Sequence, residues 1–209
     1  MTIYNLKFKN NKGFTIVELI VVMAVFLFIV GVAIGIFLSI VGQQKKVLAQ
    51  QQLLNQVSYA EEYMSKALRM ATTDVSGNCL GEDHMGYIYL LTRTSASGGI
   101  KFINQSNGYC QEFFFDNYIH GDLNSPMVLK ELKGANGVSN GNDDDAAPII
   151  SGNLQITSAN VYFNGGLSDG VSNADNVQPR LTIFFNINVL GESAMPVQIT
   201  VSQRNLNVK

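Results

Sequence analysis

The stretch Lys12–Gly42 determines how this chain is organised, and it reads KGFTIVELIVVMAVFLFIVGVAIGIFLSIVG. Between Phe14 and Val41 the only charged residue is Glu18. An apolar run longer than about 18 residues can form a helix that crosses the bilayer core, which is about 30 Å thick. The sequence therefore predicts a transmembrane helix over residues 14–42.

The residues before this run set its orientation. The first twelve residues include three lysines and no acidic residue, and lysines concentrate on the cytoplasmic side of a membrane helix. We therefore expect a cytoplasmic N-terminus, with everything after Gly42 on the other side. A secretory signal has a shorter apolar core and a cleavage site beyond it, whereas the candidate processing point here, Gly13 followed by Phe14, precedes the apolar run. The helix should remain in the mature protein.

The residues KGFTIVELI at 12–20 resemble the N-terminal signal of type IV pilins and type II secretion pseudopilins. In that family a prepilin peptidase cuts after the glycine and methylates the new N-terminal phenylalanine, and a glutamate five residues into the mature chain is needed for assembly. The resemblance implies a leader over residues 1–13, cleavage between Gly13 and Phe14, N-methylation of Phe14 and an assembly role for Glu18. The implied partners are other pilin or pseudopilin subunits, the peptidase, the filament assembly platform and, before assembly, the membrane.

The physical chemistry of Glu18 favours the same role. A carboxylate inside a bilayer costs on the order of 2.5 to 3.5 kcal/mol, so it requires a partner. Cleavage would create a free amine at Phe14, about one helical turn away. In a staggered bundle of helices, the amine of one subunit can meet the Glu18 of its neighbour, and such a buried charge pair also fixes the register.

Length and charge restrict the rest of the chain. After the leader and the membrane helix roughly 165 residues remain, which suits one globular domain. The net charge is -2 and the sequence pI is about 5.6, and the Lys45–Lys46 pair is the only basic pair after the apolar run. This composition argues against a nucleic-acid partner. We expect no cofactor.

The sequence after the apolar run predicts that the helix continues through residues 43–73 on an amphipathic pattern. No proline occurs between Phe14 and Thr73. Apolar residues recur at spacings of three and four, and they are Val47, Leu48, Leu53, Leu54, Val57, Ala60, Met64, Ala67, Leu68 and Ala71. This face should cover one side of a sheet.

Residues 74–209 are expected to form a β-rich head. Short runs of β-branched and aromatic residues alternate with turn residues, at Tyr87–Thr92, Ile100–Asn104, Tyr109–Asp116, Met127–Leu132, Leu154–Phe163, Arg180–Leu190 and Val197–Asn205. The last two runs should form an antiparallel hairpin. A long helix followed by an antiparallel sheet is an α+β fold.

The only two cysteines, Cys79 and Cys110, both lie in the part placed outside the membrane. An oxidising compartment favours a disulfide between them, which would add roughly 3 to 4 kcal/mol on the chain-entropy model. The alternative is two separate thiols. A zinc site is not expected, because the spacing of the two cysteines matches no zinc-ligand pattern.

Two acidic loops contain oxygen ligands of the kind that calcium prefers, and their acids are Asp143, Asp144, Asp145, Asp169 and Asp175. Neither loop matches the twelve-residue calcium motif, which ends in glutamate. Solvated turns are therefore expected, with no bound metal. The chain also shows no nucleophile elbow, phosphate loop or metalloprotease motif, and we expect that it is not an enzyme.

These features together indicate a filament subunit, more similar to a minor pilin or pseudopilin than to a compact major subunit. Before assembly it would be a single-pass membrane protein, and afterwards part of an extracellular or periplasmic filament. Filaments for adhesion and motility, for secretion and for DNA uptake share this N-terminal signal. The alternative is a signal-anchored extracellular protein that binds a ligand or carbohydrate and never polymerises.

Overall fold

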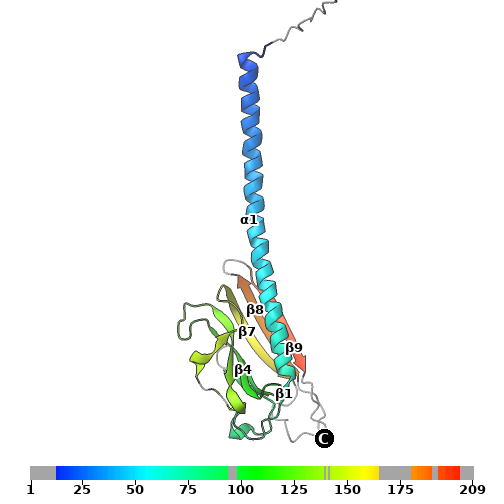
Figure 1. Ribbon diagram of the computed structural model, residues 1–209, viewed down its shortest axis with the longest axis vertical. Helices are drawn as coiled ribbons and strands as arrows, with labels where there is room; N and C mark the ends of the chain where they lie inside the picture. The colour runs from blue at the N-terminus through cyan, green and yellow to red at the C-terminus, as the bar shows by residue number, and fades with distance from the viewer. Residues whose placement is uncertain are drawn as a thin grey trace, which may run out of the picture. The chain divides into compact units, whose positions relative to one another are not determined.

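The first element of the computed structural model is a long helix, α1 (Ile16–Arg69) (Figure 1). The structure describes residues 13–93, 98–138, 140, 142–164, 180–189 and 193–202. The chain divides into two compact units, Met1–Leu48 and Ala49–Lys209.

Within the second unit, one face of α1 is buried in the core. The buried helix residues are spaced by three or four, as one helix face requires, and they are Leu53, Val57, Ala60, Met64, Ala67 and Leu68. The expectation of an apolar face from residue 47 to residue 71 is therefore only partly correct. Val47, Leu48 and Leu54 are about half exposed, and Leu54 is rotated by about 100° from Leu53 around the helix.

The helix ends at Arg69, four residues before the expected end at Thr73. The head supplies the physical reason, because Tyr89 Oη donates to the Leu68 carbonyl at 2.6 Å and the Gln105 amide donates to the Met70 carbonyl at 2.9 Å. These bonds satisfy carbonyl groups that another helical turn would have used. The next two residues instead form a short strand.

The first sheet contains six strands, all antiparallel: β1 (Ala71–Thr72), β2 (Tyr89–Thr92), β3 (Gly99–Asn104), β4 (Tyr109–Asn117), β5 (Met127–Gly134) and β6 (Ala147–Pro148). The strand order is β1-β3-β4-β5-β6, and β2 also pairs with β3. Three short 3-10 helices lie in the connections, η1 (Glu82–His84), η2 (Ala135–Gly137) and η3 (Asp143–Asp145).

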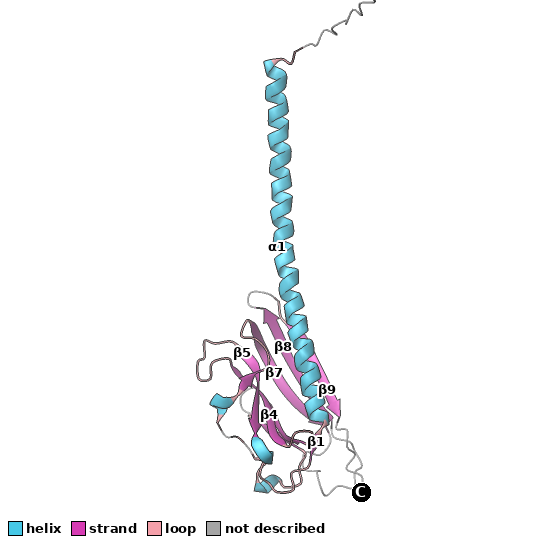
Figure 2. Ribbon diagram, in the orientation of Figure 1, coloured by secondary structure: helices cyan, strands magenta, loops and turns pink. Residues whose placement is uncertain are grey.

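The second sheet has the order β7-β8-β9, with β7 (Leu154–Asn164), β8 (Arg180–Val189) and β9 (Met195–Ser202). The expected hairpin is confirmed, since β8 pairs with β9 in an antiparallel register that aligns Ile183 with Ile199. The expected α+β class is confirmed too, although the strands form two sheets (Figure 2).

The short strand β6, which ends in Pro148, extends the first sheet by only two residues. Proline lacks the amide needed to continue a ladder.

One hydrophobic core joins α1 to both sheets. The rings of Phe115 on β4 and Phe185 on β8 lie 5.8 Å apart between centroids, which connects the two sheets. Tyr63 on α1 meets Phe113 on β4 edge to face at 6.0 Å. Met64 is fully buried in the same cluster. The end of α1 is therefore part of the head's core.

The expected disulfide between Cys79 and Cys110 is present, with a Cα–Cα distance of 5.5 Å. Cys110 lies on β4, and Cys79 lies in the loop that follows β1. Together with Leu80, the two cysteines form a second, smaller buried cluster. The disulfide thus attaches the loop that follows α1 and β1 to a central strand.

Asp74 holds this loop in shape from inside. Its carboxylate is completely buried, and it accepts hydrogen bonds from the backbone amides of Ser76, Gly77, Cys79 and Leu80 at 3.2, 2.8, 2.9 and 2.8 Å. Burial by itself raises the pKa of this carboxyl group, but the backbone hydrogen bonds outweigh burial and keep the pKa below its usual value. Asp74 therefore stabilises the fold in its ionised form.

Truncating the buried helix face should destabilise the head. Met64→Ala removes a fully buried side chain, and we expect the free energy of unfolding to fall by about 2–5 kcal/mol. Leu54→Ala is the matched control, because Leu54 is half exposed. This variant should lower the free energy of unfolding by a clearly smaller amount. Urea unfolding of the full chain, followed by near-ultraviolet circular dichroism, measures both. Equal losses would contradict the described helix face.

Replacing Asp74 should both destabilise the head and change its response to acid. In Asp74→Asn an amide group would replace one of the two accepting oxygens, so we expect a loss of about 3 kcal/mol. The pKa of Asp74 is lower in the folded state than its ordinary value of about 3.9. Asp74 therefore makes its full contribution to the free energy of unfolding above that ordinary pKa, and the contribution is lost as the pH falls through the lower folded-state pKa. Unfolding measured between pH 7 and pH 3 should therefore show a smaller acid-dependent loss in the variant. Asp83→Asn, at an exposed position, should behave as the wild type.

Candidate functional site

The N-terminus of α1 is fixed by Thr15. The Glu18 amide donates to the Thr15 carbonyl at 3.1 Å and to Thr15 Oγ1 at 3.3 Å, and the Leu19 amide donates to the same carbonyl at 3.2 Å. Threonine in this position is a helix N-cap. The sequence analysis missed this role, although Thr15 followed three residues later by Glu18 is the capping-box pattern that signals it.

The bond between Gly13 and Phe14, the expected cleavage point, lies just outside the helix. Phe14 is 81% exposed, and a side chain at Gly13 would meet no atom within 4 Å. Nothing in the described part of the chain therefore covers this bond. The rest of the leader, residues 1–12, lies outside the described residues. The exposed position of the bond is what proteolytic processing requires.

Glu18 lies in the first turn of α1 and is exposed. A negative side chain in this turn interacts favourably with the positive end of the helix dipole. Its backbone amide bonds to Thr15, while its carboxylate has no hydrogen bond or ion pair with any described residue. The carboxylate is thus available to a group from outside the chain.

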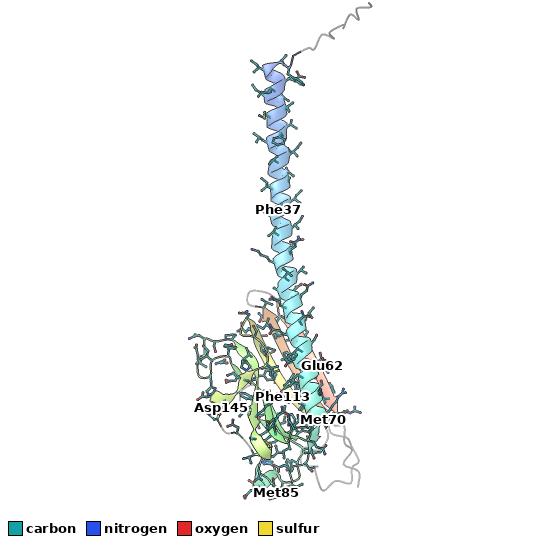
Figure 3. All side chains as sticks on the ribbon, in the orientation of Figure 1. Phe37, Glu62, Met70, Met85, Phe113 and Asp145 are labelled. Carbon is teal, nitrogen blue, oxygen red and sulfur yellow. A yellow bond between two sulfur atoms is a disulfide. The ribbon has the colours of Figure 1, made fainter. Side chains whose placement is uncertain are left out.

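The first unit offers an apolar surface on all sides of its helix. In residues 16–41 every side chain is exposed except Val30 and Val41, which are half-buried. The helix is long and apolar enough to cross a membrane, and none of its most apolar 18-residue window is buried. Phe37, labelled in Figure 3, lies on this exposed surface. Apolar surface of this extent requires lipid or other apolar helices as its surroundings.

The acidic residues considered for calcium do not form a metal site in the described part of the chain, where no three metal-ligating side chains converge. Asp143 in η3 instead forms a two-pronged hydrogen bond with the guanidinium of Arg93, which holds the pKa of that carboxyl group below its usual range. Asp144 and Asp145 are exposed in the same short helix. Asp169 and Asp175 lie outside the described residues.

Arg93 is the centre of a charge cluster that the sequence analysis did not identify. Besides Asp143 it binds Glu112 at 3.1 Å, and its guanidinium lies 3.8 Å from the centroid of the Phe114 ring. Its backbone has a φ of 54°, which is uncommon for a residue other than glycine. Three segments far apart in the sequence meet here, so the cluster attaches the η3 loop to the sheet.

The comparison with protein families agrees with the geometry of the N-terminal segment. A family model described as the prokaryotic N-terminal methylation motif matches residues 8–40. No curated protein and no solved structure matches the chain. The long apolar helix, exposed and close to the N-terminus, fits a single-pass protein anchored in a membrane. The chain thus carries a type IV pilin-like prepilin signal, which contains Gly13, Phe14 and Glu18.

Proposed function

We propose that this protein is a structural subunit, a minor pilin or pseudopilin, of a type IV pilus or a type II secretion-like filament. The observation that supports the proposal most strongly is the methylation motif at residues 8–40, in which Glu18 is the only acidic residue. The N-terminus would be cytoplasmic in the membrane-bound precursor. After assembly the head would be extracellular or periplasmic.

Processing would prepare the helix for assembly. A prepilin peptidase would hydrolyse the Gly13–Phe14 bond, which leaves a carboxylate on Gly13 and a free amine on Phe14. One methyl group would then pass from a sulfonium methyl donor, whose S–C bond breaks, to that amine, which gives up one proton. The resulting secondary amine binds a proton and keeps its positive charge. Because the Glu18 carboxylate has no partner among the described residues, it can pair with the amine of a neighbouring subunit.

As subunits leave the lipid, the helices of neighbouring subunits would replace it as apolar surroundings. Lipid tails are as apolar as these side chains, so close packing between helices and the charge pair, rather than hydrophobic burial, would favour assembly. The charge pair would then select the axial register, because a shift along the helix would leave both charges unpaired in an apolar environment. The head, with its own core and disulfide, would not need to unfold during this transfer.

The assignment to a minor pilin or pseudopilin is supported by the size of the head. The second unit, Ala49–Lys209, contains two separate sheets and a disulfide. The partners in this proposal are other subunits, the prepilin peptidase and the assembly platform. Catalysis, cofactors and nucleic acids have no part in it. A signal-anchored binding protein that never polymerises is the alternative that the experiments below exclude or support.

The mature chain should begin at an N-methylated Phe14. Mass spectrometry of the protein purified from its native host should show loss of residues 1–13 and gain of one methyl group. Gly13→Leu should block cleavage while leaving membrane insertion unchanged, because the side chain at this position has no structural neighbour. A native mass that includes the leader would exclude the proposed processing.

Changing Glu18 separates an assembling subunit from a static anchor. In an assembling subunit, Glu18→Ala leaves a neighbour's amine unpaired, which typically costs about 3–5 kcal/mol in a buried pair. We expect a cleaved, membrane-bound protein that is missing from sheared filaments, or fewer filaments if the subunit initiates them. Ser39→Ala, which changes another polar residue of the apolar helix, is the control and should assemble normally. In a static anchor, Glu18→Ala would leave surface display unchanged or slightly improved.

A further inference from the structure

The head contains a groove of about 1220 Å³ that the proposed filament role does not use. It lies within the second unit, along the last two turns of α1, beside the β3–β4 turn and the end of β9. Glu62 and Met70, labelled in Figure 3, are on its helix side. We name it the helix-end groove and define it by Tyr63, Lys66, Arg69, Asn107, Gln111 and Ser202. Its volume exceeds the 300–1,000 Å³ or so of common small-molecule pockets, so it suits an extended ligand.

The cations of the groove differ from most others in the head. Arg93, Lys130 and Lys133 each form an ion pair with an acidic side chain. By contrast, Lys66 and Arg69 form no ion pair with any described residue, and both line the groove. The helix dipole favours cations in a last turn, which explains their position. Glu62 is the one acidic residue that the lining shares with these two cations, so the lining keeps a net positive charge. An acidic group on a ligand would neutralise this charge.

The floor of the groove is held by a buried hydrogen-bond network. Gln111 Nε2 donates to Glu131 Oε1 at 2.6 Å, and Asn104 Nδ2 donates to Gln111 Oε1 at 2.6 Å. Tyr63 Oη donates to Glu131 Oε1 at 2.8 Å and accepts from Lys133 Nζ at 2.9 Å. These bonds fix the amide groups and the ring of Tyr63 before any ligand arrives, which lowers the entropic cost of binding.

The remaining lining is rich in groups that bind hydroxyls. Asn107 contributes an exposed amide, and Ser65, Ser106 and Ser202 contribute hydroxyls, whereas the amides of Asn104 and Gln111 are buried in the network beneath them. Amides and hydroxyls of this kind pair with sugar hydroxyl groups.

We propose that the helix-end groove binds an anionic oligosaccharide, whose acidic groups lie at Lys66 and Arg69 and whose hydroxyls meet Asn107 and the serine hydroxyls of the lining. Two unpaired cations favour an acidic ligand over a neutral one. The amide and hydroxyl lining favours a sugar over an acidic peptide, which has few hydroxyl groups. This inference concerns the head alone and holds for a filament subunit and for a static anchor.

Isothermal titration calorimetry of the full chain in detergent tests the proposal, with pentagalacturonate and a hyaluronan hexasaccharide as probes. At least one probe should bind the wild type, with affinity that decreases as salt increases. The double variant Lys66→Gln/Arg69→Gln should bind about tenfold more weakly or worse, which corresponds to one lost charge contact or more. Arg180→Gln is the matched control, since Arg180 is an exposed cation of the head that does not line the groove, and its affinity should stay within about twofold.

Two comparison ligands decide the chemical class. Maltopentaose carries hydroxyls without charge, and pentaglutamate carries charge without sugar rings, so both should bind at least about tenfold more weakly than the better acidic sugar. Equal binding of pentaglutamate would overturn the sugar assignment. Failure of both acidic sugars to bind at millimolar concentration, or their unchanged binding to the double variant, would overturn the groove proposal. Thermal melting of each variant must match the wild type. Because unassembled protein is titrated, these results are independent of whether the protein enters filaments.

Discussion

The structure depends on a helix whose surroundings change along its length. From residue 16 to residue 41 the helix is apolar on every side and none of its side chains is fully buried, whereas from Leu53 to Leu68 one face is buried in the head. Apolar area exposed to water costs about 25 cal/mol per Å², so the first segment must lie in lipid or among other helices. The second segment finds its apolar surroundings within its own chain. A membrane-anchored precursor satisfies both requirements.

The end of α1 is held to the head by contacts of three kinds. Its buried face packs in the common core, and Tyr63 connects it to β4 and, through Glu131, to β5. Just beyond the helix, β1 pairs with β3, and Asp74 and the disulfide fix the following loop. These contacts are close together along the chain, so a force applied to this part of the helix would pass to the centre of the first sheet.

The sequence was sufficient to predict features that depend on local pattern. The β-rich runs Arg180–Leu190 and Val197–Asn205 predicted a hairpin, and β8 and β9 form it. The end of the helix was predicted too late, because it depends on hydrogen bonds from Tyr89 and Gln105, which only the folded head brings to it. The division into two sheets also depends on contacts between distant segments. The last predicted strand extended to residue 205, and its residues 203–205 lie outside the described part of the chain.

In the candidate sites too, the sequence predicted the residues that belong to a short motif and did not predict the contacts between distant segments. Gly13, Phe14 and Glu18 were identified from a short motif because their function depends on sequence order, and the Thr15 cap could have been found in the same way. Nothing in the order of residues indicates that Lys66 and Arg69 lack acidic partners, since Glu62 is one helical turn before Lys66 and could pair with it. Only the folded structure shows that these cations open on a groove. A sequence motif therefore identifies the N-terminal signal of this chain, whereas the groove of its head is formed by the packing of distant segments.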